Sequence, residues 1–262
     1  DHTPLIGMTP QEQATRLSRS WRDIESWTGV GPAGLRPPEE AADSVTLGTW
    51  KQMGGTYVLA SNEARSASPE IHATDAGPVV LLPRVLKDDY TVIVRDVTLR
   101  SQGLVTAWLA DTRKMRAIGG LAVIAGHTQI IVDGPRLEAV RTIADTVRSE
   151  GGWWLARADE VADWWLARRD VDVRWTDASP DPGRGFTATG LPDLTVSIAT
   201  GSAVDDLWVD VVLPMADQTV IPVLDGVSVE FGAEPWGMRV RVGALAAGDV
   251  RRISFVTVAT TP

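Results

Sequence analysis

Apolar positions in the first 170 residues occur at helical spacing in some stretches and as short continuous runs in others. Helical spacing begins after the capping pattern of residues 9–12 and predicts a helix that ends at Gly29. The same spacing predicts further helices at residues 45–53, 104–117, 135–147 and 159–169. Short apolar stretches predict strands at residues 56–59, 79–82, 121–125 and 153–155. Strands and helices therefore alternate, as in an α/β fold.

Residues 171–262 carry a different pattern. Apolar and polar residues alternate within residues 171–175, 195–198, 208–211, 227–231, 238–242 and 253–258. This period of two predicts half-buried strands, and Gly, Pro and Asp separate them. We therefore predict two domains, an α/β domain over residues 1–170 and an all-β sandwich over residues 171–262.

Trp is unusually common, with 11 residues against three Phe and two Tyr. The Trp residues of interest are Trp153, Trp154, Trp164 and Trp165 in the first domain and Trp175, Trp208 and Trp236 in the second. Exposed indole rings could stack on sugar rings, but side chains of this size are more often buried. We predict that both groups belong to domain cores.

Composition excludes several classes of protein. The chain has 25 Lys and Arg against 34 Asp and Glu, a formal net charge of −9, and no Cys, so disulfides and Cys-based metal sites are excluded. No apolar run reaches the ~18 residues that a membrane span needs. An acidic chain without a basic stripe is not expected to bind nucleic acid. The absence of Cys suits an oxidising setting, and we expect an extracellular or cell-envelope location.

The three His residues are the first candidates for acid–base or metal chemistry. His127 comes directly after the apolar run 121–125 and Gly126, at a strand end where α/β barrels gather catalytic groups. It could equally be a structural His bonded to a nearby carbonyl group. His2 could be a ligand or a solvated terminal side chain, and His72 is expected at the surface of a polar loop.

Two charged segments are further candidates. Arg36 precedes Pro37-Pro38, and its guanidinium could orient a carboxylate or form a structural loop salt bridge. The segment Asp88-Asp89-Tyr90 could hold Arg36 or a metal ion, although acidic pairs in loops are commonly only solvated.

Five segments of residues 1–170, taken in order, resemble the later part of one protein family. They are Asp1-His2-Thr3-Pro4-Leu5 with residues 8–12, Gly34-Leu35-Arg36-Pro37-Pro38, Leu82-Pro83-Arg84 with Asp88-Asp89-Tyr90, the run 121–127, and residues 153–165. The family is the NodB-homology polysaccharide deacetylases, of the carbohydrate esterase family 4 type. The resemblance does not extend to residues 171–262.

The resemblance implies a distorted (β/α) barrel and a metal-dependent hydrolase that removes N-acetyl groups from a polysaccharide. In such enzymes a divalent metal, often zinc, is held by two His and one Asp, and a second Asp is the general base. Carried over to this chain, His2 would be the second metal His and Arg36 would orient the base. His127 would be the general acid, and Asp89 could support either Arg36 or His127.

This chain also departs from the family pattern. The strand that carries the base and the metal Asp is not in the sequence, and the first metal His would lie four residues before His2. The chain is therefore expected to hold a partial barrel that lacks the base and two metal ligands. We expect these groups upstream of Asp1, either in an earlier part of a longer polypeptide of which this chain is a fragment or in a separate N-terminal polypeptide that completes the barrel. The Gly that usually follows the Arg-x-Pro motif is also missing, so the loop after residue 36 is expected to differ.

Three hypotheses follow. The leading one is the C-terminal part of a metal-dependent deacetylase that acts on a cell-wall or extracellular N-acetylated polysaccharide. The second is a non-catalytic carbohydrate-binding or scaffold protein on a degenerate deacetylase fold. The third is an assembly subunit whose β-rich domain binds a partner or completes an envelope structure.

Overall fold

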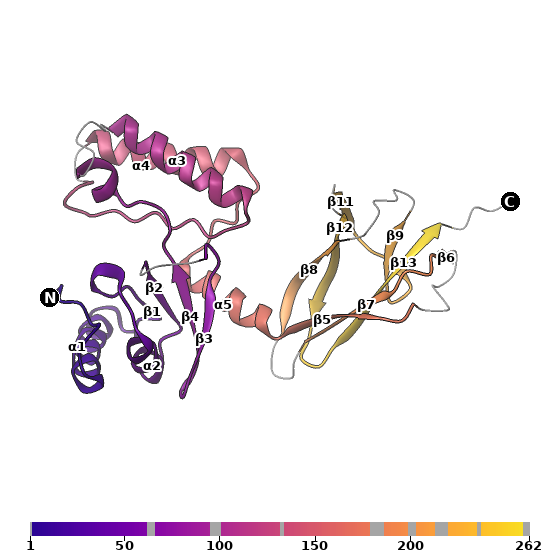
Figure 1. Ribbon diagram of the computed structural model, residues 1–262, viewed down its shortest axis with the longest axis horizontal. Helices are drawn as coiled ribbons and strands as arrows, with labels where there is room; N and C mark the ends of the chain where they lie inside the picture. The colour runs from indigo at the N-terminus through magenta and orange to yellow at the C-terminus, as the bar shows by residue number, and fades with distance from the viewer. Residues whose placement is uncertain are drawn as a thin grey trace. The chain divides into compact units, whose positions relative to one another are not determined.

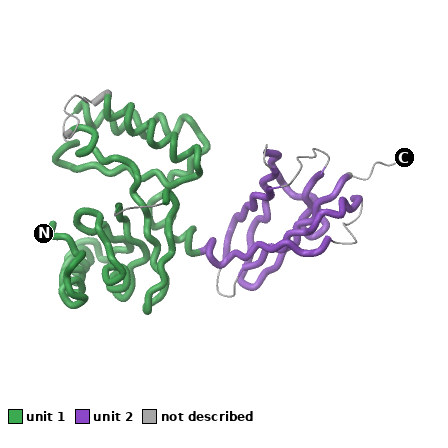
Figure 2. Tube along the Cα trace, viewed as in Figure 1, with its two compact units in different colours: residues 1–166 green, residues 167–262 purple. Residues whose placement is uncertain are grey.

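Figure 1 shows a computed structural model of the protein, which describes residues 2–61, 66–94, 101–131, 134–178, 186–198, 203–212, 220–234 and 237–258. The chain divides into two compact units, Asp1–Leu166 and Ala167–Pro262 (Figure 2). The sequence pattern changes slightly later, after residue 170. Asp1 and Trp236, which the sequence analysis names, lie outside the described residues.

Unit 1 alternates strands and helices. Its described strands are β1 (Gly34–Leu35), β2 (Tyr57–Ala60), β3 (Glu70–Thr74) and β4 (Gly77–Pro83). Its described helical segments are α1 (Pro10–Thr28), η1 (Pro38–Glu40), α2 (Ser44–Gln52), η2 (Tyr90–Val94), α3 (Ser101–Ala117), α4 (Gly134–Glu150) and α5 (Ala158–Arg169). No helix among the described residues is long and apolar enough to cross a membrane.

The strands of unit 1 form one sheet in the order β1-β2-β4-β3. β1, β2 and β4 run parallel, and β3 pairs antiparallel with β4. The carboxyl ends of the parallel strands therefore lie at one edge of the sheet. Arg36 follows β1 and Arg84 follows β4 at this edge, which brings two distant parts of the sequence together.

Several buried clusters hold unit 1 together. Leu17 of α1 and Val58 of β2 belong to a core that α1 and α2 form with the sheet. Trp108 of α3 and Ile143 of α4 belong to a second core, and these two helices lie side by side (Figure 1). Leu82 of β4 packs in a cluster with α5. These cores fix the loops that follow β1 and β4.

The caps of α1 confirm the sequence prediction. The Thr9 hydroxyl accepts the Glu12 N–H at 3.3 Å, and the Glu12 carboxylate accepts the Thr9 N–H at 2.9 Å. Gly29 ends the helix with a φ of 78°, a left-handed conformation that Gly adopts without steric cost.

Asp43 caps α2, and its removal is expected to destabilise unit 1. Asp43 Oδ1 accepts the Thr46 N–H at 2.8 Å. Burial raises the pKa of Asp43, but hydrogen bonds from Thr46 and Gln13 outweigh burial and bring the pKa below its ordinary value. Asp43→Ala is expected to lower the free energy of unfolding by about 1 kcal/mol near neutral pH, measured by urea denaturation.

The stabilisation by Asp43 is expected to depend on pH. Because the pKa of Asp43 is depressed in the folded state, its contribution is complete above the unfolded pKa and is lost as pH falls through the folded pKa. The difference between wild type and Asp43→Ala should therefore shrink in strong acid. Asp145→Ala, at an exposed position of α4, is the control. A deficit of equal size at neutral and strongly acidic pH would contradict a role for the ionised carboxylate.

Two predicted strands of unit 1 are wrong. Residues 121–125 and 153–155 pair with no strand among the described residues. A strand exists only where neighbouring backbone satisfies its N–H and C=O groups. Residues 121–125 instead make isolated contacts: the Leu121 N–H donates to the Ala67 carbonyl at 2.6 Å, and the Asp89 N–H donates to the Ala125 carbonyl at 3.3 Å.

The prediction that the Trp residues of unit 1 are core side chains is wrong for two of them. Trp154 is 58% exposed and Trp164 is 46% exposed, with their ring centroids 5.9 Å apart. Trp153 is half-buried against the α3–α4 core, and Trp165 is half-buried in the α5 cluster. The spacing of these residues along the sequence does not distinguish the exposed Trp side chains from the half-buried ones.

Unit 2 consists of two antiparallel sheets. Its strands are β5 (Val171–Thr176), β6 (Phe186–Ala188), β7 (Asp193–Ile198), β8 (Val204–Val212), β9 (Ile221–Leu224), β10 (Val227–Ser228), β11 (Phe231–Glu234), β12 (Gly237–Leu245) and β13 (Val250–Val258). One sheet has the order β10-β9-β13-β7-β5, with β6 also paired to β13, and the other has the order β11-β12-β8.

One core joins both sheets of unit 2. Val196 of β7 and Ile253 of β13 pack in the same buried cluster as Val211 of β8 and Val240 of β12. The prediction that Trp175 and Trp208 belong to this core is wrong, since they are 51% and 37% exposed. Trp175 lies on β5, at the end of its sheet, and Trp208 lies on the outer side of β8.

Candidate active site

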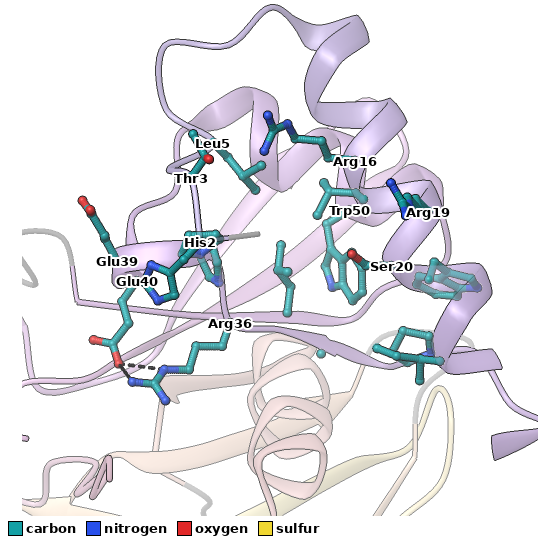
Figure 3. Close-up of a pocket in the computed structure, with 18 of the residues that line it drawn as sticks. His2, Thr3, Leu5, Arg16, Arg19, Ser20, Arg36, Glu39, Glu40 and Trp50 are labelled. Atoms are coloured by element: carbon teal, nitrogen blue, oxygen red, sulfur yellow. Dashed lines mark hydrogen bonds and ion pairs between the residues drawn. The ribbon is translucent and has the colours of Figure 1, made fainter. Parts of the chain in front are cut away.

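A cavity of about 1010 Å³ lies in unit 1, at the carboxyl-end edge of the sheet. Figure 3 shows that residues before and within α1, Arg36 after β1, residues of η1 and Trp50 of α2 contribute to its wall. The charged and titratable side chains of interest along this wall are His2, Arg36, Glu40, Arg84, Asp88 and His127. The cavity thus gathers three of the four sequence-predicted site residues, and Asp89 lies directly behind it.

Asp89 is fully buried and holds His127. Asp89 Oδ1 accepts a hydrogen bond from His127 Nδ1 at 2.6 Å, and Asp89 Oδ2 accepts the His127 backbone N–H at 2.7 Å. The Tyr90 N–H also donates to Asp89 Oδ1, at 2.9 Å. Three donors therefore satisfy a buried carboxylate. Because a carboxylate can only accept, Nδ1 carries a proton and Nε2 is the nitrogen left to exchange one.

Arg36 pairs with Glu40 and not with Asp89. Arg36 Nε and Nη2 both donate to Glu40 Oε1, at 2.9 and 2.6 Å (Figure 3). Arg84 Nε donates to the other carboxylate oxygen, Glu40 Oε2, and Arg84 Nη1 donates to the Leu86 carbonyl at 2.5 Å. Of the two partners that the sequence left open for Asp89, the structure shows His127.

Glu40 is a site residue that the sequence analysis missed. Its side chain is 6% exposed, and it joins Arg36, after β1, to Arg84, after β4. Glu39 and Glu40 have φ values of 57° and 54°, a left-handed region that costs a non-Gly residue free energy. The family pattern usually places Gly shortly after the Arg-x-Pro motif. That missing Gly was the one signal in the sequence for this unusual backbone.

Asp88 contributes a second carboxylate to the cavity wall, separate from Asp89. Its Oδ1 accepts the Thr91 N–H at 2.7 Å. Burial raises the pKa of Asp88, but the hydrogen bonds from Thr91 and the charges of Arg84 and His127 together bring it below its ordinary value. Asp88 is therefore ionised at neutral pH, next to His127.

The metal expected from the family resemblance does not fit the described residues by themselves. His2 is exposed and lines the cavity. No group of three or more His, Cys, Asp and Glu side chains in the described ranges is arranged to hold a metal ion. Catalytic zinc sites normally use three protein ligands, so His2 alone would not suffice. His72 does not lie in a loop as predicted, because residues 70–74 pair with β4 as strand β3. Its Nε2 is 3.5 Å from a Glu70 carboxylate oxygen, and it does not line the cavity.

Removing the Glu40 carboxylate is expected to destabilise unit 1. Glu40→Ala leaves Arg84, whose side chain is 14% exposed, without its carboxylate partner. We expect the free energy of unfolding to fall by about 2–3 kcal/mol, measured by urea denaturation. Glu39→Ala is the matched control, because Glu39 has a similar φ but is exposed; its effect should stay within about 0.5 kcal/mol. Equal losses in the two variants would show that the arginine pairs contribute nothing.

Comparison with solved structures identifies the fold. A protein from Mycobacterium smegmatis assigned as a polysaccharide deacetylase matches with a TM-score of 0.57 and 24% identity, over 64% of this chain and 61% of that chain. A PuuE allantoinase matches with a TM-score of 0.54 and 17% identity, over 63% of this chain and 56% of that chain. A protein from Pseudomonas aeruginosa PAO1 assigned as a polysaccharide deacetylase matches with a TM-score of 0.53 and 16% identity, over 63% and 56%.

Between 63% and 64% of the chain therefore shares the α/β fold of these solved structures, as the resemblance of its sequence motifs predicts. It spans between 56% and 61% of the length of these structures. No protein-family model matches the chain, and no curated protein sequence matches it. The likeness to solved structures thus defines the fold alone.

Proposed function

We propose that this chain is the C-terminal part of a metal-dependent deacetylase that removes N-acetyl groups from a cell-wall or extracellular polysaccharide. In this proposal unit 1 is a partial NodB-type barrel, unit 2 is an accessory β-sandwich, and the protein acts outside the cytoplasm. The observation that carries the proposal is the buried Asp89 bound to His127 at the wall of a large cavity.

The reaction needs a proton donor at the position that His127 would take. Water adds to the carbonyl carbon of the acetamide, the C–N bond breaks, and acetate and a free amine are released. The nitrogen must gain a proton as the bond breaks, because an amide anion is a very poor leaving group. In its charged form His127 would donate this proton from Nε2, while Asp89 holds Nδ1 and fixes the ring.

Arg36 would orient the carboxylate of the general base or stabilise the negative charge that develops on the acetamide carbonyl oxygen. Glu40 engages Nε and Nη2 of Arg36, and the Arg36 side chain is 45% exposed. Guanidinium donors that stay accessible can orient a carboxylate or stabilise developing negative charge. Asp89 is then a positioning residue for His127, and Glu40 is a positioning residue for Arg36.

The base and the metal would come from a further polypeptide segment upstream of Asp1. Among the described residues β1 pairs with β2 alone, so one edge of this short strand has no partner. The cavity runs along β1, and the apolar side chains Leu17, Trp21, Leu35 and Trp50 line it. An extended segment could pair with β1 there and bring carboxylates close to Arg36 and His2. A divalent metal, such as zinc, would supply an activated water once the remaining ligands join His2.

One observation favours the alternative, a non-catalytic carbohydrate-binding or scaffold protein. Arg36 already pairs with a carboxylate of this chain, Glu40, so it does not require an upstream base. In that case the cavity would bind a glycan without cleaving it.

Native mass spectrometry of the purified protein, followed by an acetate-release assay on N-acetylated oligosaccharides, separates these two functions. The proposal expects a second polypeptide or a longer chain, one bound divalent ion, and acetate release that a chelator abolishes. A folded, metal-free chain near 28.2 kDa that binds the oligosaccharide and releases no acetate would support the alternative.

A further inference from the structure

The outer side of the β11-β12-β8 sheet of unit 2 carries an ordered set of polar and aromatic side chains. Alternation turns Val209 and Val211 of β8 toward the core and leaves Trp208 and Asp210 outside. Arg241 lies opposite Trp208 across the β12–β8 pair, and Arg239 lies opposite Asp210. We call this surface the Trp208 face; its members are Asp206, Trp208, Asp210, Glu230, Glu234, Arg239 and Arg241.

Hydrogen bonds fix both arginines of the Trp208 face and three of its four carboxylates. Arg239 donates from Nε and Nη2 to the two Asp210 oxygens, at 2.7 and 3.0 Å. Arg241 donates to Asp206 at 2.8 Å and to Glu230 at 2.9 Å, and its guanidinium carbon lies over one face of the Trp208 ring, 5.8 Å from the ring centre.

Trp208 itself is both anchored and accessible. Its indole N–H donates to Asp206 Oδ2 at 3.2 Å, while 37% of the residue stays exposed. An indole ring that stays partly exposed, beside fixed hydrogen-bonding groups, can stack on the apolar face of a sugar ring.

The charge of this surface indicates what kind of glycan would bind. The Trp208 face has four carboxylates and two guanidinium groups, which leaves an excess of negative charge. Unit 2 as a whole has eight Arg, no Lys and 13 Asp and Glu, a formal charge of −5. A neutral or acidic glycan gains nothing from this field, whereas a glycan with ammonium groups is attracted.

We propose that the Trp208 face binds a glycan that carries free amino groups, such as a polymer with deacetylated glucosamine units. A sugar ring stacks on Trp208. Its ammonium group is attracted by the carboxylates of the face, such as Glu234, because the face has more carboxylates than guanidinium groups. The choice of ligand rests on the proposed function, because N-deacetylation produces this amine on the polysaccharide. Unit 2 would then keep the protein on polymer that has already been processed.

Calorimetric titration of the full chain with deacetylated and N-acetylated glucosamine oligosaccharides of equal length tests this site. The deacetylated oligosaccharide should bind more tightly, and its affinity should fall as salt is raised. Trp208→Ala should weaken that binding about three- to tenfold. Trp27→Ala, at a Trp of unit 1 that is 81% exposed, is the control and should bind as wild type does.

A second pair of variants tests the contribution of charge. Glu234→Gln removes one negative charge from the Trp208 face and should weaken binding of the deacetylated oligosaccharide severalfold at low salt. Glu138→Gln, at an exposed position of α4 in unit 1, should leave binding unchanged. Wild-type affinity in Trp208→Ala, or equal affinity for both oligosaccharides, would overturn the inference.

The outcome separates this inference from the proposed function. If wild type releases acetate and Trp208→Ala binds the oligosaccharide as wild type does, the deacetylase proposal stays intact and the Trp208 site is rejected. Binding of the deacetylated oligosaccharide that depends on Trp208 would support the site. If wild type purified together with any metal and partner it retains then releases no acetate, the deacetylase is rejected.

Discussion

Replacing His127 with Asn is expected to lower acetate release from N-acetylated oligosaccharides by about 10²–10⁴-fold. Asn has no group that can donate a proton to the leaving nitrogen near neutral pH. The variant keeps the backbone N–H that donates to Asp89 Oδ2. Asp89 Oδ1 keeps the Tyr90 N–H but loses the Nδ1 donor, so the free energy of unfolding should fall by about 1 kcal/mol. Turnover at saturating substrate and thermal unfolding of the same preparation measure the two effects.

The control for this variant is His72→Asn. His72 lies in β3, away from the cavity wall, so its replacement should leave acetate release unchanged. Comparable losses in the two variants would indicate a general effect of losing an imidazole and would reject His127 as the acid. A large loss of substrate affinity with unchanged turnover in His127→Asn would also reject it, because that pattern marks a binding residue.

Replacing Asp89 is expected to damage both catalysis and stability. Asp89→Asn can place an amide NH₂ against His127 Nδ1, which favours the opposite tautomer and moves the ring proton to Nε2. We expect turnover to fall by about 10²-fold or more. Asp89→Ala leaves the N–H groups of Tyr90 and His127 and the Nδ1 proton without an acceptor. It should lower the free energy of unfolding by about 3 kcal/mol.

The two Asp89 variants separate positioning from folding. Turnover and urea denaturation are measured for both, with Asp145→Asn, at a position 77% exposed, as the control. In Asp89→Asn the free energy of unfolding should fall only modestly, whereas turnover should fall by far more than this loss of stability explains. A variant that keeps full turnover would show that the Asp89–His127 hydrogen bond does not serve the reaction. A ¹⁵N spectrum that shows the same neutral tautomer of His127 in wild type and Asp89→Asn would contradict the tautomer change as the cause.

Local patterns in the sequence predict the helices of unit 1 well, because caps and helical spacing involve neighbouring residues. The capping box at Thr9 and the end of α1 at Gly29 are examples. The strands predicted at residues 121–125 and 153–155 fail for the opposite reason. Their apolar composition allows a strand, but a strand also needs a partner that local sequence does not reveal.

The candidate site was predictable only in part. The family resemblance identified four candidate residues, which are His127, Arg36, Asp89 and His2. The structure brings the first three to one edge of the sheet and places His2 at the same cavity. Glu40 was missed, because its role depends on a left-handed backbone and on a contact with Arg84, which is distant in sequence. Contacts of this kind are set by the sheet order and cannot be read from spacing.

The dependence of the His127→Asn effect on the leaving group tests the central claim most directly. An acetamide must receive a proton as its nitrogen leaves, whereas the nitrophenolate of 4-nitrophenyl acetate leaves without one. With the protein purified together with any metal and partner it retains, His127→Asn should lower hydrolysis of the N-acetyl oligosaccharide by about 10²-fold or more. Hydrolysis of the ester should fall by less than about threefold. Equal losses with the two substrates would contradict the assignment of His127 as the general acid.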